Sequence, residues 1–335
     1  MTFKLIIASA VSTLISYIIG IYMIPWLRDK KKAGQKIKKI GPTWHMSKAG
    51  TPTMGGVFFI ASTAVTLGLF GSTFTVLKDY RHIILFVFAF LYGLIGFIDD
   101  YSKVRKKRNT GLSTKSKFLL QIVLALALVY FLRQMNYLSE LIYVPFFNIS
   151  FKLPSLVYYT FMVIFIVGTV NSVNITDGVD GLAAGTSIPV LAFFVIICQF
   201  WNRNYAIGIF ASSLLGGLIG FLGHNYFPAK VFMGDTGSLF LGGAIAGLAI
   251  SFDMPLILVV LCLMFVIETL SDIIQVSYFK LSGGKRVFKM APFHHHLEMG
   301  GWTGKKWSET ELFTLYLSIS TVCAIISFMG IYNRF

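Results

Sequence analysis

The sequence predicts an all-α integral membrane protein with about ten transmembrane helices. Of its 335 residues, 56% are hydrophobic and only 13% are charged, whereas soluble domains carry roughly 25% charged residues. The mean hydropathy is +0.74. The apolar residues form long runs separated by short, mostly basic loops, with no repeat and no soluble insertion. We therefore expect one polytopic membrane domain over residues 1–335.

Ten apolar segments meet, or nearly meet, the roughly 20 residues that a spanning helix needs. They are residues 3–27, 53–72, 82–98, 117–137, 155–171, 183–200, 205–222, 236–252, 255–278 and 311–333. The first run is longer than the apolar part of a signal peptide and ends without a small-residue cleavage site, so we expect it to be a retained span. Alternating apolar residues in the connection 138–154 predict a small β-hairpin.

The distribution of basic residues orients these spans. Of the 29 Lys and Arg residues, 22 lie in loops 28–50, 99–117, 223–234 and 279–310, which fall on one side of the predicted membrane. Cytoplasmic loops carry such an excess, so this side is predicted to be cytoplasmic and both termini to be extracytoplasmic. The net charge of +15 is explained by basic loops that set the orientation of the protein in the membrane and lie near anionic lipid. No nucleic acid partner is therefore expected.

Five polar motifs fall on the predicted cytoplasmic side, although none of them was used to build the topology. They are SKAGTPTMGG (47–56), GFIDDYSK (96–103), NSVNITDGVDG (171–181), GHNYFPAKVFMGDTGS (223–238) and APFHHHLE (291–298). Their convergence predicts an active site on the cytoplasmic face of the membrane.

Acidic residues are the most unusual members of these motifs. Asp99 and Asp100 end a span where the helix dipole disfavours carboxylates; they are either an interfacial stop signal or groups that hold Mg²⁺ or a phosphate. Asp177 and Asp180 are spaced to share one face at the start of the sixth span, as helix caps or as ligand-binding residues. Asp235, among glycines and hydroxyl residues, is either an N-cap or part of a phosphate or metal site.

Two further groups leave alternatives open. The run His294, His295 and His296 lacks the spacing of a zinc site, and it is either a basic-aromatic interfacial loop or a set of phosphate contacts. Glu268 and Asp272 lie one turn apart within a predicted span. Intramembrane acids are functional candidates by default, and hydrogen bonding between helices is the alternative.

The motifs hold acids, lysines, histidines and glycine-rich turns, without a paired nucleophile and base. This combination favours phosphoryl transfer over acyl transfer. Phosphoryl transfer needs mainly positioning and charge neutralisation, which carboxylate-bound Mg²⁺ and basic side chains supply.

The same motifs resemble one family over essentially the whole chain. The runs KAGTPTMGG, DDYSK, NITDGVDGL, FMGDTGS and PFHHHLEMGGW are similar to the signatures of the phospho-N-acetylmuramoyl-pentapeptide transferase (MraY) family of polyprenyl-phosphate N-acetylhexosamine-1-phosphate transferases. The resemblance implies a homodimer of ten-span subunits in the bacterial plasma membrane. It also implies that UDP-N-acetylmuramoyl-pentapeptide reacts with undecaprenyl phosphate to give UMP and lipid I, with Mg²⁺ as cofactor.

The resemblance also implies roles for individual residues. Asp99, Asp100 and Asp235 match the catalytic acids, with Asp235 as the Mg²⁺ ligand. The ninth helix is expected to bend around a groove for the lipid tail. The substrate-binding positions are Lys48, Thr51, Lys103, Lys115, Asn174, Asp177, Asp180, Asn225, Phe232, His294, His295 and His296. Among these, the positions that match residues holding the uridine are Lys103, Asp180, Asn225 and Phe232, and Phe232 is expected to stack on uracil.

Two other functions compete with this one. A transporter of anionic or lipid-linked solutes would suit the basic loops, but transporters place their binding residues near the membrane midplane, often in repeated halves. A sibling transferase acting on another UDP-sugar differs mainly in the region 291–303, where the three-histidine run favours the muramoyl substrate.

Overall fold

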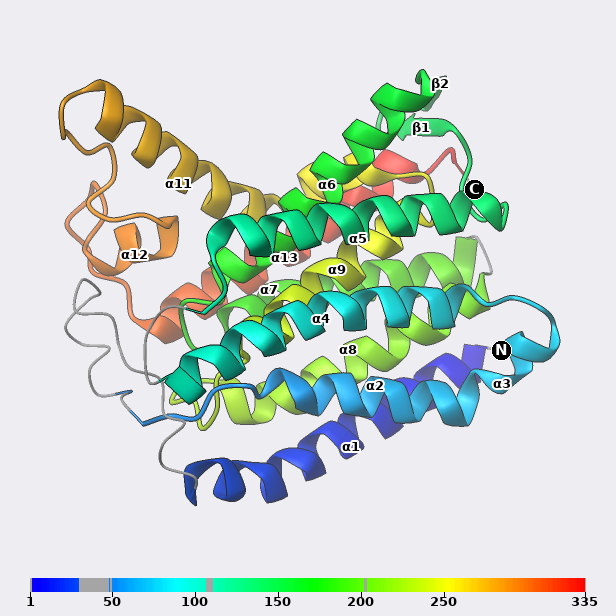
Figure 1. The fold of residues 1–335 in the computed structure, drawn as a ribbon, viewed down its shortest axis with the longest axis horizontal. Helices are drawn as coiled ribbons and strands as arrows, with labels where there is room; N and C mark the ends of the chain where they lie inside the picture. Colours follow the sequence, from blue (N-terminus) through cyan, green and yellow to red (C-terminus); the bar gives the residue numbers. More distant parts are fainter. Residues whose placement is uncertain (1, 30–47, 49, 107–110, 202–203, 335) are drawn as a thin grey trace.

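The computed structural model describes residues 2–29, 48, 50–106, 111–201 and 204–334, and these are almost wholly helical (Figure 1). The elements in chain order are α1 (Thr2–Asp29), α2 (Gly56–Phe70), α3 (Ser72–Val76), α4 (Arg81–Lys106), α5 (Thr114–Gln134), β1 (Leu141–Val144), β2 (Ile149–Lys152), α6 (Ser155–Thr176), α7 (Leu182–Ile196), η2 (Ile197–Trp201), α8 (Tyr205–Asn225), α9 (Gly234–Ile250), η3 (Pro255–Ile257), α10 (Leu258–Leu261), α11 (Leu263–Leu281), α12 (Phe293–Glu298) and α13 (Glu309–Ile331).

The described helices are those of an integral membrane protein. Seven of them, α1, α4, α5, α6, α7 with η2, α8 and α13, are long and apolar enough to cross a membrane, and a bent pair could add an eighth. Two further predicted spans correspond to the shorter apolar helices α2 and α9, with 15 and 17 residues. All ten predicted segments are therefore largely helical. The helix expected over 53–72 starts only at Gly56, because residues 52–55 pair through their backbones with the segment before α9.

The bend expected in the ninth predicted helix is present, because an angle of 86° separates Pro255–Leu261 from α11. One predicted position differs from the structure. Asp177 and Asp180 were expected in the first turn of the sixth span, and this was wrong. Helix α6 continues to Thr176, and α7 begins after Gly181, whose φ of 72° ends the turn between them. Both acids therefore lie on that turn.

The hairpin predicted in the connection 138–154 is confirmed. Strands β1 and β2 pair antiparallel, with Leu141 opposite Lys152 and Val144 opposite Ile149. The hairpin lies at the same end of the bundle as both chain termini (Figure 1).

Helix α9 runs through the centre of the bundle, and every residue from Thr236 to Ile250 is buried. Glycines allow its neighbours to approach closely. A Cβ on Gly96 of α4 would lie 2.1 Å from the carbonyl oxygen of Asp235, and a Cβ on Gly56 of α2 would lie 2.2 Å from the Cα of Gly237. Such small-residue contacts are typical of helix packing in membranes. They fix the start of α9 beside the end of α4.

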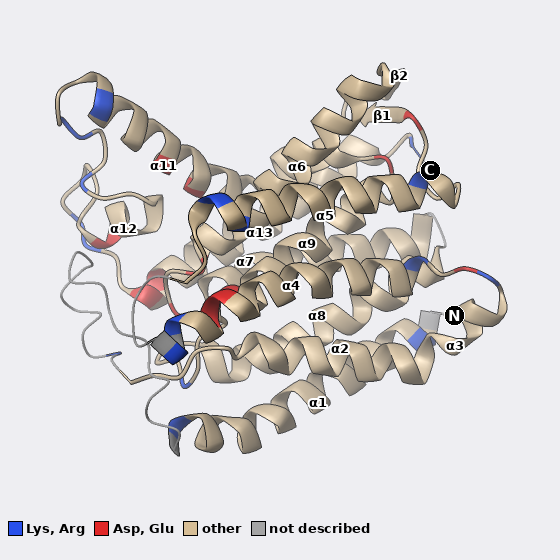
Figure 2. Cartoon of the chain, viewed as in Figure 1, with Lys and Arg blue, Asp and Glu red and all other residues tan. Residues whose placement is uncertain are grey.

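Charged residues gather at the two ends of the bundle and leave its middle apolar (Figure 2). The outer faces of the helices carry exposed large apolar side chains, among them Ile21, Leu126, Ile164 and Ile325, as expected for helices that face lipid. A cluster of acids lies at the end opposite the two termini. Most of the basic residues counted in loop 28–50 lie at positions 30–47, outside the described residues.

Candidate active site

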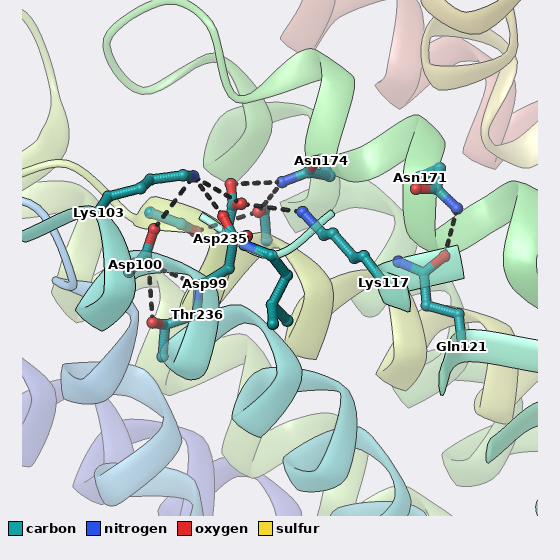
Figure 3. A network of polar contacts seen from close by, with 12 residues as sticks. Asp99, Asp100, Lys103, Lys117, Gln121, Asn171, Asn174, Asp235 and Thr236 are labelled. Carbon is teal, nitrogen blue, oxygen red and sulfur yellow. Dashed lines mark hydrogen bonds and ion pairs between the residues drawn. The ribbon is translucent and has the colours of Figure 1, made fainter. Parts of the chain in front are cut away.

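Three carboxylates from two distant parts of the chain meet at this end of the bundle. Asp99 and Asp100 lie near the end of α4, and Asp235 lies in the first turn of α9 (Figure 3). One oxygen from each carboxylate lies within 4.8 Å of the others, so the three could hold one metal ion. Asp99 and Asp100 are buried. Carboxylate oxygens are the ligands that Mg²⁺ prefers.

Backbone donors hold the first two acids in place. The Leu112 N–H donates to Oδ1 of Asp99 over 2.7 Å. Asp100 accepts through Oδ2 from both the backbone N–H (3.0 Å) and the hydroxyl (2.9 Å) of Thr236. Because Thr236 follows Asp235 directly, these bonds couple the end of α4 to the start of α9.

Two lysines neutralise part of the negative charge. The Lys103 Nζ lies 2.5 Å from Asp99 Oδ2 and 3.0 Å from Asp235 Oδ2, and Lys117 Nζ lies 2.9 Å from the same Asp235 oxygen (Figure 3). Both side chains keep some solvent exposure, with exposed fractions of 32% for Lys103 and 17% for Lys117. They are therefore placed to meet an anionic ligand at the acid cluster.

Helix α6 completes the cluster on its other side. The Asn174 side-chain amide donates to Asp235 Oδ1 over 3.0 Å and to the Ser238 hydroxyl over 2.8 Å. Asp177 follows at the end of the helix. Its burial, together with the nearby carboxylates of Asp235 and Asp100, raises the pKa of Asp177 above its ordinary value. A cation bound among these acids would favour the ionised form.

A second polar group lies around Asp180. Lys48 pairs with Asp180 Oδ1 at 2.6 Å and with Glu309 Oε2 at 2.5 Å. The other oxygen of Asp180 accepts from the Ala229 N–H over 2.8 Å, and Asn225 accepts from the Gly181 N–H over 3.2 Å. This group joins the loop before α2 to the starts of α7 and α13.

The segment that carries Phe232 is held from both sides. The Phe232 N–H donates to the Pro52 carbonyl over 2.9 Å, and the Gly55 N–H donates to the Phe232 carbonyl over 2.8 Å. The Thr51 N–H in turn donates to the Lys48 carbonyl. The residues of the TPTMGG motif therefore line up against the segment that leads into α9.

The three histidines have different surroundings. His294 is buried, and its Nδ1 lies 3.0 Å from Oε2 of Glu268, which is also buried. His295 faces Glu298 at 2.6 Å. His296 accepts through Nδ1 from the Lys289 N–H and packs against the Trp302 ring. His294 faces the turn that carries Asp177 and Asp180, because a Cβ on Gly178 would lie 2.4 Å from its Nε2.

The structure brings most of the predicted site residues together in two adjoining groups. Lys103, which the resemblance assigns to uridine binding, lies in the acid cluster. Lys115 is exposed on the first turn of α5, and Lys117 reaches the cluster. Lys117 was expected only as one of the basic residues of loop 99–117, and no role was predicted for Glu309. Lys115 and Lys117 are two residues apart, which puts them on different faces of a helix. This spacing indicates that only one of the two lysines can face the cluster.

The fold and this site define an integral membrane enzyme with an acid-rich centre at one end of a helical bundle. The chain matches the model of glycosyl transferase family 4 over residues 82–253 and the phospho-N-acetylmuramoyl-pentapeptide-transferase signature 1 over residues 48–60. Curated proteins with the name phospho-N-acetylmuramoyl-pentapeptide-transferase are similar along their whole length. The protein of Caldanaerobacter subterraneus subsp. tengcongensis is 47% identical, covering 95% of this chain and 99% of the relative. That of Clostridium acetobutylicum is 41% identical, covering 96% and 97%.

The chain therefore belongs to the phospho-N-acetylmuramoyl-pentapeptide transferase family, as the motifs predicted. Membership makes it a transferase of a bacterial membrane and places it among the enzymes of phospho-sugar transfer in peptidoglycan synthesis. The transporter alternative is thereby disfavoured.

Proposed function

We propose that the protein transfers phospho-N-acetylmuramoyl-pentapeptide from its UDP-activated form to undecaprenyl phosphate, giving lipid I and UMP. The observation that carries the proposal is the convergence of Asp99, Asp100 and Asp235 with Lys103 and Lys117 at one end of the bundle. The names of the relatives support the choice of substrate.

Magnesium is the proposed cofactor. The three carboxylates supply hard oxygen ligands within reach of one ion, so the donor set fits Mg²⁺, with Asp235 as a ligand. The bound ion would offset charge on the diphosphate and on the departing UMP. Removal of Mg²⁺ by EDTA is expected to stop UMP release, and added Mg²⁺ to restore it.

In the proposed reaction, a phosphate oxygen of the lipid bonds to the sugar-linked phosphorus, and the bond from that phosphorus to the UMP oxygen breaks. Lys103 and Lys117 hold the phosphates by charge, since each has an ammonium group directed into the cluster. In-line positioning and charge neutralisation account for most catalysis in reactions of this type.

We assign Asp99 and Asp100 an orienting or metal-binding role and not that of a base. A phosphate monoester has a second pKa of about 6, so it needs little help to ionise at neutral pH. Both acids already accept hydrogen bonds from the backbone. The contrary result would be an Asp99→Asn or Asp100→Asn enzyme whose rate recovers at high pH as the lipid phosphate ionises.

The second polar group is proposed to bind the nucleotide and the amino sugar. Asp180, Asn225 and Phe232 lie next to one another around the segment before α9, which suits a uridine with Phe232 stacked on its base. The remaining proposed substrate contacts are Lys48, Thr51, Lys115, Asn174, Asp177, His294, His295 and His296.

For the whole chain we propose ten spans in one membrane domain, extracytoplasmic termini and a homodimer. The position of both chain ends opposite the acid cluster (Figures 1 and 2) supports an even number of spans. Lys4→Cys and Lys285→Cys, each labelled with an impermeant thiol reagent, should react from opposite sides of the membrane. Cross-linking and mass measurement in detergent would test the dimer.

The deciding experiment measures UMP release by purified protein with undecaprenyl phosphate, Mg²⁺ and UDP-N-acetylmuramoyl-pentapeptide, beside Asp235→Ala. Release by the wild type alone supports the transferase and the role of Asp235. Release with UDP-N-acetylglucosamine and not with the muramoyl substrate would identify the sibling activity instead. No release from folded protein with either substrate would refute the proposal.

A further inference from the structure

Glu268 is a fully buried acid that the proposed reaction does not use. It lies on α11, six residues after the break at Cys262, and none of its side-chain surface is exposed. Burial of an isolated carboxylate is costly, so such a group must be compensated by donors or positive charge. Its partners therefore indicate why the acid is there.

Three donors from two other helices converge on Glu268. The backbone N–H of His294 donates to Oε1 over 3.1 Å, His294 Nδ1 lies 3.0 Å from Oε2, and the buried Tyr316 hydroxyl of α13 also donates to Oε1. Because an ionised carboxylate only accepts hydrogen bonds, Nδ1 must carry the hydrogen. Glu268 thus fixes both the ring orientation and the tautomer of His294.

The other ring nitrogen faces the proposed active site. His294 Nε2 is buried without a hydrogen-bond partner in the described chain. A Cβ on Gly178 would lie 2.4 Å from this atom, so it lies directly under the turn between Asp177 and Asp180. A buried polar atom usually has a hydrogen-bond partner. Because Nε2 has none and lies beneath a turn proposed to bind substrate, we expect the substrate to complete its hydrogen bond.

The charges around His294 favour the cationic ring. Burial alone lowers the pKa of His294, but the carboxylates of Glu268, Glu298 and Asp272 overcome this effect and raise it. Asp272 and Glu268 face the ring from α11, Glu298 from α12 and the Tyr316 hydroxyl from α13. A cationic ring carries a hydrogen on Nε2 and suits a phosphate oxygen.

We infer that Glu268 is a positioning residue for the nucleotide-sugar: through His294 it holds an Nε2–H donor under the Gly178 turn, directed at the phosphates of the substrate. The inference rests on the proposed function for the identity of the substrate, but the orientation of the ring does not depend on it. Glu268 touches no reacting atom.

The first test observes the ring directly, without catalysis. In protein carrying ¹⁵N-histidine, NMR should show His294, assigned with His294→Gln, with hydrogen on both Nδ1 and Nε2. The Nε2 resonance should shift on addition of UDP but not of uridine. Glu268→Gln should change the wild-type signal and abolish the UDP response. An unchanged His294 signal in Glu268→Gln, or a wild-type signal indifferent to UDP, overturns the inference.

The second test is a double-variant cycle on UMP release. Loss of a residue that orients a ligand typically costs about 10- to 100-fold, so Glu268→Gln and His294→Gln should each lower kcat/KM by that factor. The double variant should be no worse than His294→Gln alone. The alkaline limb of the pH profile, where His294 loses its proton, should move to lower pH in Glu268→Gln. If the loss in kcat/KM of the double variant equals the product of the two single losses, the coupling between Glu268 and His294 is refuted.

Two further variants make the cycle robust. Asp272→Asn removes the same charge one turn along α11, and it should shift activity far less because Asp272 makes no hydrogen bond to the ring in the described chain. Gly178→Ala displaces the ring from the opposite side, and it replaces Glu268→Gln in the cycle if that variant does not fold. A wild type without UMP release would refute the proposed function alone, since the NMR result decides the role of Glu268 separately.

Discussion

Replacement of Gly96 by alanine tests the claim that close packing of α4 on α9 positions the acid cluster. The new Cβ would lie 2.1 Å from the Asp235 carbonyl oxygen, whereas ordinary contact begins at 3.4 Å. The two helices must therefore separate by about 1.3 Å, the difference between these distances. Overpacking of this kind costs typically about 1–3 kcal/mol. Misplacement of reacting groups by about 1 Å can cost about 100-fold in rate.

The assay measures UMP release and the midpoint of thermal unfolding for Gly96→Ala in detergent. Gly68→Ala is the matched control, because a Cβ on Gly68 meets nothing within 4 Å. We expect Gly96→Ala to lower both activity and unfolding temperature, and Gly68→Ala to change neither. Wild-type rate and stability in Gly96→Ala would refute the idea that helix contact sets the geometry of the site.

Three further perturbations follow from the contacts of the site. Lys117→Ala should lower kcat by about 100-fold, as loss of a charge-stabilising group does, and more than Lys115→Ala; equal losses would contradict the assignment of Lys117 to the cluster. Glu309→Gln should raise the KM for the UDP-substrate by about tenfold, the effect of losing a hydrogen bond to a charged group, as measured by initial rates; an unchanged KM would separate this residue from nucleotide binding. Asp235→Asn should require more Mg²⁺ for half-maximal activity, and an unchanged Mg²⁺ titration would remove Asp235 from the metal site.

The sequence predicted the apolar helices and the motif positions well, because hydropathy alone determines which segments enter a membrane. The resemblance implied a bend in the ninth helix, but the residues alone could not place it at Cys262, where neither proline nor glycine marks a bend. The sequence also could not tell which lysine of α5 faces the cluster, since the rotation of a helix is set by its neighbours. The contact between Lys48 and Glu309 joins residues 261 positions apart and depends on the complete arrangement of helices.

The short length of α9 has a consequence for the proposed lipid substrate. Its 17 residues make a helix about 26 Å long, at 1.5 Å per residue, whereas the hydrocarbon core of a bilayer is about 30 Å thick. Helix α4 has 26 residues and extends further at the end that carries the acids. The start of α9, with Asp235, lies beside Gly96, and α4 continues beyond this level to Lys106. In the proposed reaction, a polyprenyl phosphate would reach the level of Asp235 by moving sideways through the leaflet, with its chain still in hydrocarbon.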